Sequence, residues 1–362
     1  MKSNYKRLGE FISPQNYLND GMEVSELLGI SNQKYFQKSH TNINGMDFST
    51  YRIVRTGQFA FNRATTRNGE KISIALRQGG DCIVSPSYRV FQVNNENELL
   101  SEYLLMWFKR PEFDRYVRFK SHGSAHEFFE YDQMCDVELP VPHIIKQREI
   151  VKEYNVIQNS ITLNQQLIQK LEETAQAIYK EWFVEGIDIE NLPEGWKVGS
   201  FEELIEISSG KSVSDKNDLK NDHYKYPIFG AGGIMGYSNE FSFNEKLFSI
   251  GRVGTHGIVQ RINFPCWLSD NTLVLKSSSY EYVYQILLNI NYDEINRGGV
   301  QGLITQTDIK NLQILIPENS ILEKFEKTVL KLFELQNNVQ NQNQKLTELK
   351  ELLLSKLATI EN

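Results

Sequence analysis

The longest regular pattern in the chain is a row of mostly apolar residues whose spacings alternate between four and three without a break. Its members are Ile150, Tyr154, Ile157, Ile161, Asn164, Ile168, Leu171, Ala175, Ile178 and Trp182. This alternation places every member on one stripe of an α-helix and is typical of a coiled-coil seam. It predicts a helix over residues 143 to 185, ~60 Å long at 1.5 Å per residue.

A weaker copy of the same pattern follows 175 residues later. The offset holds without a gap from Gly123 to Trp182 and aligns "CDVELPVP" (135–142) with "KNLQILIP" (310–317). Each proline stands where a helix can begin without losing a needed N–H group. The copied seam is Phe325, Val329, Leu332, Gln336, Val339, Asn343, Leu346, Lys350, Leu353 and Leu357. Three of these positions are polar, and we expect Leu335 and Leu349 beside two of them to supply apolar contact.

The two helices are expected to pair antiparallel. The chain must leave the end of the first helix and return to the start of the second, which is simplest when a whole domain forms the connection. If equivalent positions pair about a pseudo-twofold axis, Ile150 faces Leu357, Trp182 faces Phe325 and Asn164 faces Asn343. Two facing asparagines would satisfy each other's amides and disfavour slipped registers. The alternative is that both asparagines face solvent.

The predicted fold class is α+β, with two globular α/β domains separated by the two long antiparallel helices. "EKLFSIGRV" (245–253) and "CWLSDNTLVLK" (266–276) predict strands, and helices are expected at 97–108 and 280–288. The predicted boundaries are 1–142 for the first globular domain, 143–190 for the first spacer helix, 191–316 for the second domain and 317–362 for the second helix.

Composition and charge narrow the class of protein. The three cysteines lie far apart without metal-ligand spacing, and no run approaches the ~20 apolar residues of a membrane span. We therefore expect a cytoplasmic protein with reduced thiols and no metal site. The formal net charge of -7 disfavours a nucleic-acid partner at first sight, because phosphate affinity comes from lysine and arginine.

The charge is unevenly distributed, however. Residues 51–89 carry Arg52, Arg55, Arg63, Arg67, Lys71, Arg77 and Arg89 against Glu70 and Asp81, which makes the stretch locally +5. A second basic run covers residues 109–120. Such runs are either solvated surface or phosphate-binding surface, and charge alone does not decide between them.

No stretch carries the pattern of a catalytic site. "SGKS" (209–212) lacks the glycine that a phosphate-binding loop needs at position 205, which is isoleucine. "GAGG" (230–233) is expected to be a turn between strands. "GRVGTHG" (251–257) is expected to be a strand and a tight turn, from which Arg252 and His256 could reach a phosphate or a base edge. We expect no catalytic residues in this chain.

Several segments together resemble one known family. They are "AIYKEWFVEGIDIENLPEGWKVGSFEELIEISSGKS" (177–212), "YPIFGAGGIMGYSNEF" (226–241), "LFSIGRVGTHGIVQ" (247–260), "PCWLSDNTLVL" (265–275), "GLITQTDIKNLQILIP" (302–317), "YRIVRTGQFAFNRATTRNGEKISIA" (51–75) and "IVSPSYRVFQV" (83–93). This combination resembles the specificity (S) subunits of type I restriction-modification systems and covers nearly the whole chain. The first domain departs from the pattern in lacking a leading "LPxGW".

The resemblance implies a non-catalytic subunit that recognises double-stranded DNA. Each globular domain would be a target-recognition domain that reads one half of a bipartite site, with the helices setting the spacing and docking two methyltransferase (M) subunits. The chain would bind no cofactor itself: S-adenosylmethionine would be bound by the M subunits, and ATP and Mg by any restriction (R) subunits that join. Half-sites one DNA turn apart lie ~34–36 Å centre to centre, which a ~60 Å helix can span.

Both domains contain residue types that commonly contact DNA: arginine for guanine or phosphate, glutamine for adenine and tyrosine for stacking or phosphate. The predicted contacts are Arg52, Arg55, Arg63, Arg67, Tyr88, Arg89 and His126 in the first domain and Lys211, Lys225, Arg252, His256, Arg297 and Gln301 in the second. For each of them, an ordinary surface or salt-bridge role is the alternative.

Two other functions fit less well. A non-enzymatic coiled-coil adaptor with two protein-binding heads would share the architecture but would not need the basic stretch at 51–89. A nuclease or methyltransferase would need a catalytic constellation that the sequence lacks.

Overall fold

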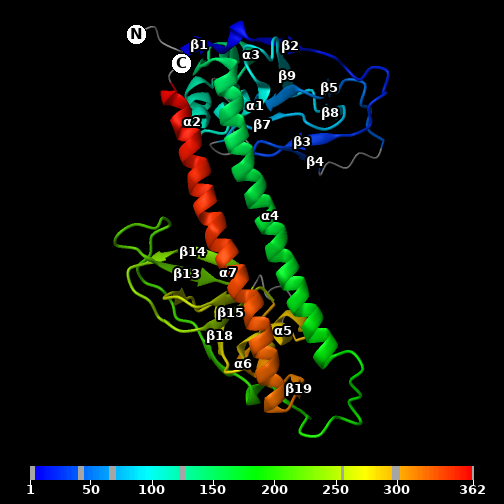
Figure 1. The fold of residues 1–362 in the computed structure, drawn as a ribbon, viewed down its shortest axis with the longest axis vertical. Coiled ribbons are helices and arrows are strands. Elements are labelled where there is room, and N and C mark those ends of the chain that lie inside the picture. Colours follow the sequence, from blue (N-terminus) through cyan, green and yellow to red (C-terminus); the bar gives the residue numbers. More distant parts are fainter. Residues whose placement is uncertain are drawn as a thin grey trace. The chain divides into compact units, whose positions relative to one another are not determined.

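The computed structural model describes residues 5–39, 45–64, 71–121, 127–253, 257–295 and 302–360. These fall into two compact units: Met1–Asn164 with Asn341–Asn362, and Gln165–Gln340. Helices α4 (Ile144–Phe183) and α7 (Asn319–Lys356) each run from one unit into the other (Figure 1). Each unit is therefore a globular head combined with one end of both long helices.

The first head is built on an antiparallel sheet with strand order β2 (Ile12–Gln15), β9 (Tyr88–Val93), β6 (Gln58–Asn62) and β7 (Ile74–Leu76). Because side chains alternate between the faces of a strand, Phe59 and Phe61 pack on one face and Ala60 on the other. The aromatic face meets α1 (Ser101–Phe108), where the Phe59 ring lies edge-on to Phe108, 5.6 Å away. Helix α1 begins four residues later than expected because residues 95–99 form a turn, in which the amide of Leu99 donates to the carbonyl of Asn95.

Smaller elements complete this head. The pairs β3 (Leu28–Ile30) with β4 (Phe36–Lys38) and β5 (Arg52–Val54) with β8 (Cys82–Val84) contribute to the core on the alanine face of the sheet. Strand β1 (Tyr5–Arg7) pairs with β10 (Glu138–Pro140), and two short helices, α2 (Pro111–Lys120) and α3 (Tyr131–Cys135), precede β10. Leu354 and Leu357, at the far end of the chain, are buried in the main core of this unit, and Tyr5 donates to the carbonyl of Ala358.

The second head repeats the plan with strand order β12 (Glu206–Ser209), β18 (Thr272–Lys276), β15 (Leu247–Gly251) and β16 (Val259–Ile262). Helix α5 (Tyr280–Asn289) covers one face, where Tyr280 stacks on Phe248 with ring centroids 4.0 Å apart. Strand β11 (Lys197–Ser200) pairs with β19 (Gln313–Ile316), which follows α6 (Gln306–Lys310). A second sheet has the order β14 (Gly233–Ser238), β13 (Tyr226–Gly230) and β17 (Trp267–Leu268).

The predicted strands of this head are confirmed with one correction. The segment 266–276 is not one strand but two, β17 and β18, separated by a turn in which the amide of Thr272 donates to the carbonyl of Ser269. Asp270 and Asn271 lie in this turn and favour such a conformation. "GAGG" is a turn between β13 and β14, as expected.

The duplication extends further than the gapless alignment suggested. Helices α3 and α6 and helices α4 and α7 begin 175 residues apart, as do strands β10 and β19. Beyond this stretch, the four strands of the main sheets follow each other in the same order in both heads. Insertions of unlike length separate the equivalent strands, so one constant offset cannot align them.

The long helices pair antiparallel within each unit, and α4 and α7 contain the two predicted seams. In the first unit, Asn164 donates from Nδ2 to Asn343 Oδ1 at 2.9 Å, while Ile150 and Leu357 share one core. In the second unit, the rings of Trp182 and Phe325 lie 6.0 Å apart. These are the contacts of the pseudo-twofold register.

The expected role of two leucines is wrong. Leu335 is 45% exposed and Leu349 is 49% exposed, so neither fills the seam. The polar seam residues keep their places because each has a partner on α4: Gln336 donates to Glu172 Oε1 at 2.7 Å and Lys350 to Gln158 Oε1 at 3.2 Å. Because these polar groups are hydrogen-bonded within the helix interface, they can be buried there at little cost in free energy.

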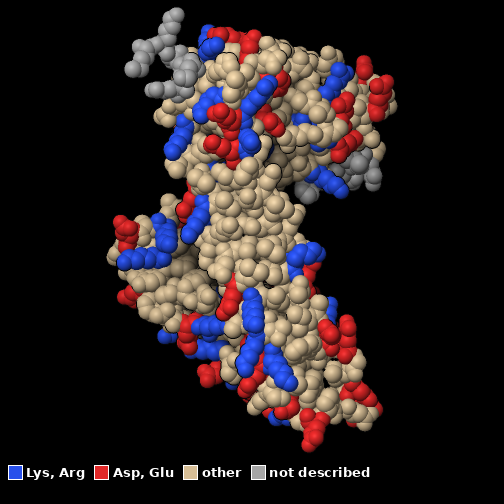
Figure 2. Space-filling view, viewed as in Figure 1, with Lys and Arg blue, Asp and Glu red and all other residues tan. Residues whose placement is uncertain are grey.

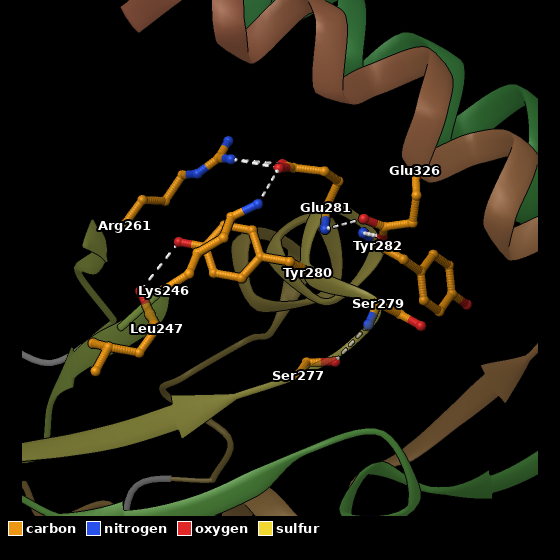
Figure 3. Close-up of polar contacts among 9 residues, drawn as sticks. All are labelled: Lys246, Leu247, Arg261, Ser277, Ser279, Tyr280, Glu281, Tyr282 and Glu326. Atoms are coloured by element: carbon orange, nitrogen blue, oxygen red, sulfur yellow. Dashed lines mark hydrogen bonds and ion pairs between the residues drawn. The ribbon is translucent and has the colours of Figure 1, made fainter. Parts of the chain in front are cut away.

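Each head is attached to a long helix by hydrogen bonds at the start of its core helix. In the first unit, Gln147 of α4 accepts from the amide of Leu100, just before α1. In the second unit, Glu326 of α7 accepts from the amides of Glu281 and Tyr282 in the first turn of α5 (Figure 3). A carboxylate placed there satisfies amides that have no partner within the helix.

Glu326 predicts a pH dependence of stability. Burial raises its pKa, against the opposing effect of the two amides. A raised carboxyl pKa stabilises the fold below the unfolded-state pKa, and this contribution is lost as pH rises through the folded-state pKa. We expect Glu326→Gln to remove that loss, so that the variant gains stability relative to the unmodified chain as pH rises from about 4.5 to 7. Urea unfolding at both pH values measures the difference; a difference that is constant with pH would contradict it.

Two further features of the described residues concern membrane-spanning helices and the cysteine thiols. No described helix combines the length and apolar character that crossing a bilayer requires. Cys82 and Cys266 are buried, which raises the pKa of each thiol to about 11, whereas Cys135 is half-buried. All three thiols are free, as expected.

Candidate nucleic-acid interface

Three of the predicted arginines come together in the first head. Arg52 lies on β5, Arg89 lies on β9 opposite Phe61 of β6, and Arg63 follows directly after β6. The pKa of the Arg52 guanidinium is lowered first by burial and then by the positive charges of Arg89 and Arg63. Repulsion between like charges is a cost to the folded head that a bound polyanion would relieve.

One carboxylate holds two of these arginines in place. Glu130 Oε1 accepts from Arg63 at 2.8 Å, and its Oε2 lies 3.4 Å from Arg89 Nε. Glu130 also caps α3, in a capping box with Gln133. Arg52 instead donates to neutral oxygens, Asn16 Oδ1 at 2.9 Å and the carbonyl of Pro86. The cluster therefore keeps an excess of positive charge, and Arg52 has no carboxylate partner among the described residues.

Arg55 and Tyr88 lie beside this cluster in different settings. The Arg55 guanidinium stacks 4.4 Å above the ring of Tyr17, which is 48% exposed. Tyr88 is partly buried, its ring packs against the smaller core of the head, and its hydroxyl accepts from the amide of Ile30 at 3.4 Å. Burial raises the Tyr88 pKa. The DNA contacts proposed for both residues stay predictions.

In the second head, Lys211 and Arg252 bind the same turn between β17 and β18. The amide of Lys211 donates to Leu268, and the amide of Arg252 donates to Asn271. Gly210 permits this approach, because a Cβ atom there would lie 2.1 Å from the carbonyl oxygen of Ser269. Lys225 lies just before β13, at the opposite end of that strand from the GAGG turn. No described contact joins Lys225 to Lys211 or Arg252.

Other predicted residues fall outside the described ranges: Arg67 and His126 in the first head, and His256, Arg297 and Gln301 in the second. Two residues that contact the predicted arginines of the first head were not themselves predicted. Glu130 orients Arg63 and Arg89, and its place before "YDQM" as a helix cap was the available signal. Tyr17, which stacks on Arg55, lies in no sequence pattern that would have predicted this contact.

No group of His, Cys, Asp or Glu suited to a metal ion occurs among the described residues.

Comparisons with known proteins agree on one family. The profile of the type I restriction modification DNA specificity domain matches residues 19–173 and again residues 193–351. The type I restriction enzyme MjaIX specificity subunit of Methanocaldococcus jannaschii is 24% identical, over 72% of this chain and 68% of that protein. The HindI specificity subunit of Haemophilus influenzae is 20% identical, over 91% of each chain.

The fold has a solved counterpart. The crystal structure of the type I restriction-modification system S subunit from M. genitalium aligns over 99% of this chain and 96% of that chain, with a TM-score of 0.61 at 14% sequence identity. At this identity the likeness concerns the fold. The two profile matches cover most of both heads and both helices, so the chain belongs to the family of type I restriction-modification DNA specificity subunits.

Proposed function

We propose that the chain is the DNA-recognition subunit of a type I restriction-modification complex. Each head reads one half of a bipartite duplex site, while the paired helices set the distance between the halves and dock two methyltransferase subunits. The chain itself performs no catalysis and binds no cofactor. S-adenosylmethionine belongs to the methyltransferase subunits, ATP and Mg to restriction subunits where these join, and the complex works in the cytoplasm.

The observation that carries this proposal is the duplication. Elements that begin 175 residues apart and a shared strand order make the second head a variant of the first. Two related readers in one chain suit a site with two halves. The arginine cluster around Glu130 supplies the phosphate- and guanine-binding chemistry that one such reader needs.

The long helices support the docking of protein partners. Residues 154–169 of α4 and 335–344 of α7 contain no charged residue, and Figure 2 shows an uncharged face over the middle part of these helices. In the first unit, Val156 is 58% exposed and Leu163 is 64% exposed on α4. An exposed apolar surface without charge suits a protein rather than DNA.

The test is a map of methylated adenines. Genomic DNA from cells that make the chain with its methyltransferase partner should carry methylated adenine in a two-part sequence with a fixed gap. Exchanging the first head for that of a relative should change one half of the sequence only. Methylation that does not depend on the chain, or a continuous recognition sequence, would refute the proposal.

Replacing Arg52 is expected to weaken DNA binding by the first head. We expect Arg52→Ala to weaken binding of the assembled complex to its site by about 1–3 kcal/mol, because it removes a cation that has no carboxylate partner among the described residues. If Arg52 contacts a base, the substitution should relax the sequence preference at one position of one half-site. If it contacts a phosphate, the substitution should weaken binding to all sequences alike. Competition binding with duplexes altered in either half measures this.

The matched control is Arg115→Ala. Arg115 lies on α2 of the same unit, its side chain is 70% exposed, and it pairs with Glu112 at 3.1 Å. It should change binding by less than about 0.5 kcal/mol. An equal loss in both variants would mean that only overall charge matters and that the cluster does not form the interface.

A further inference from the structure

The first unit contains a pocket of about 510 Å³ that DNA recognition does not explain. Its walls come from the turn between β3 and β4, the junction of α1 and α2, and the facing sides of α4 and α7. All these segments belong to the same compact unit. The volume falls within the ~300–1,000 Å³ range of small-molecule sites.

Four lysines line the pocket, and one of them is neutralised. The buried ammonium of Lys34 lies 2.8 Å from Asp114 Oδ1 and also donates to the carbonyl of Phe108. This pair ties the β3–β4 turn to α1 and α2, so Lys34 has a structural role. Its charge is not available to a ligand.

The other three lysines have no carboxylate partner among the described residues. Lys109 donates to the hydroxyl of Tyr154 at 3.1 Å, and Lys350 donates to Gln158 Oε1 at 3.2 Å. Lys71 is exposed at the rim, and its charge, with that of Lys109, adds to burial in lowering the Lys34 pKa. Three ammonium groups therefore line the pocket without a carboxylate partner among the described residues.

The carboxylates of the lining offset only part of this charge. Glu112 lies 3.4 Å from Arg110 and 3.1 Å from Arg115, and Asp114 is held by Lys34. Glu351 is the remaining carboxylate of the lining, and it is exposed.

Lysine binds phosphate as a compact point charge with three donors. A ligand with several negatively charged oxygens can neutralise all three ammonium groups. A ligand with a single carboxylate carries only one negative charge and would leave the other ammonium groups without a counter-charge. We propose that this pocket binds a phosphate-bearing ligand through Lys71, Lys109 and Lys350. The phosphate comes from a free phosphorylated compound or from a DNA backbone, and the site does not require the sequence-reading function proposed above.

Titration calorimetry of the full chain with inorganic tripolyphosphate, in 150 mM salt, tests the proposal. We expect saturable binding of one ligand per chain, weakened at least tenfold by the double substitution Lys109→Gln with Lys350→Gln. The control pair, Lys152→Gln with Lys356→Gln, removes the same charge from the same unit outside the pocket and should stay within twofold. Lys71→Gln, at an exposed position, should weaken binding severalfold even if the double variant proves unstable.

Two results would overturn the proposal: no saturable binding by the unmodified chain, or an equal loss in the pocket and control pairs. A non-specific duplex separates the two sources of phosphate. Displacement of tripolyphosphate by the duplex identifies the DNA backbone as the ligand. Undisturbed binding identifies a free phosphorylated compound.

Discussion

Adding the methyltransferase subunits is expected to tighten binding of the chain to its recognised duplex by at least about a hundredfold. The chain has a formal net charge of -7, and its arginine cluster is one local exception. Alone, it should bind DNA in the non-specific range, about 10⁻⁴–10⁻⁶ M at physiological salt. The complex should reach the specific range of about 10⁻⁸–10⁻¹¹ M, because its partners neutralise further phosphates.

Fluorescence anisotropy with a labelled duplex in 150 mM salt measures both affinities. The control duplex keeps its length and composition but has both half-sites scrambled. The gain on adding the partners should be much larger for the true site than for the control. Nanomolar binding by the chain alone would contradict this account, because the two heads would then need no help to neutralise DNA.

Replacing Arg261 with methionine is expected to lower the free energy of unfolding of the second unit by about 3–5 kcal/mol. The side chain of Glu281 has no exposed surface, and Arg261 donates to its two oxygens at 2.8 and 2.6 Å (Figure 3). The guanidinium also lies 3.6 Å from the ring centroid of Phe333 of α7. Removing the arginine would leave a buried carboxylate whose remaining cation, Lys246, is 45% exposed.

Lys246→Met is the matched control, since it removes the other cation from the same carboxylate. We expect it to cost no more than about 1 kcal/mol, because a partly exposed lysine is well solvated when free. Trp182 and Trp196 pack against the core of this unit, so their fluorescence reports its unfolding in urea. Adding Glu281→Gln to Arg261→Met should recover part of the loss. Equal losses in the two single variants would disprove the assigned role of Arg261.

The long helices could be predicted because their determinants are local. A 4-3 spacing fixes which stripe of a helix is apolar, and the asparagine in each seam favours the register in which Asn164 meets Asn343. The error at Leu335 has the same root. Spacing alone does not reveal that Gln336 donates to Glu172 across the interface, so apolar contact was expected from Leu335 beside it, which is exposed.

The heads were less predictable because their sites depend on strand order. The density of arginine at 51–89 was visible, but the approach of Arg52 to Arg63 and Arg89 requires β5, β6 and β9 to be neighbours, which no local pattern states. The surroundings of Lys34 were even less predictable from local sequence. It occupies a turn with φ of 67° and is buried against a carboxylate eighty residues later in the chain. The lysine pocket likewise joins segments scattered from residue 32 to 355.

The burial of Leu354 and Leu357 in the core of the first head has a consequence for synthesis on the ribosome. Domains usually fold in order as the chain emerges, but this head lacks part of its interior until residues 354–357 have been made. Nascent chains should therefore carry an unfinished first head throughout synthesis of the second head. A premature stop late in the message would damage the region that was made first.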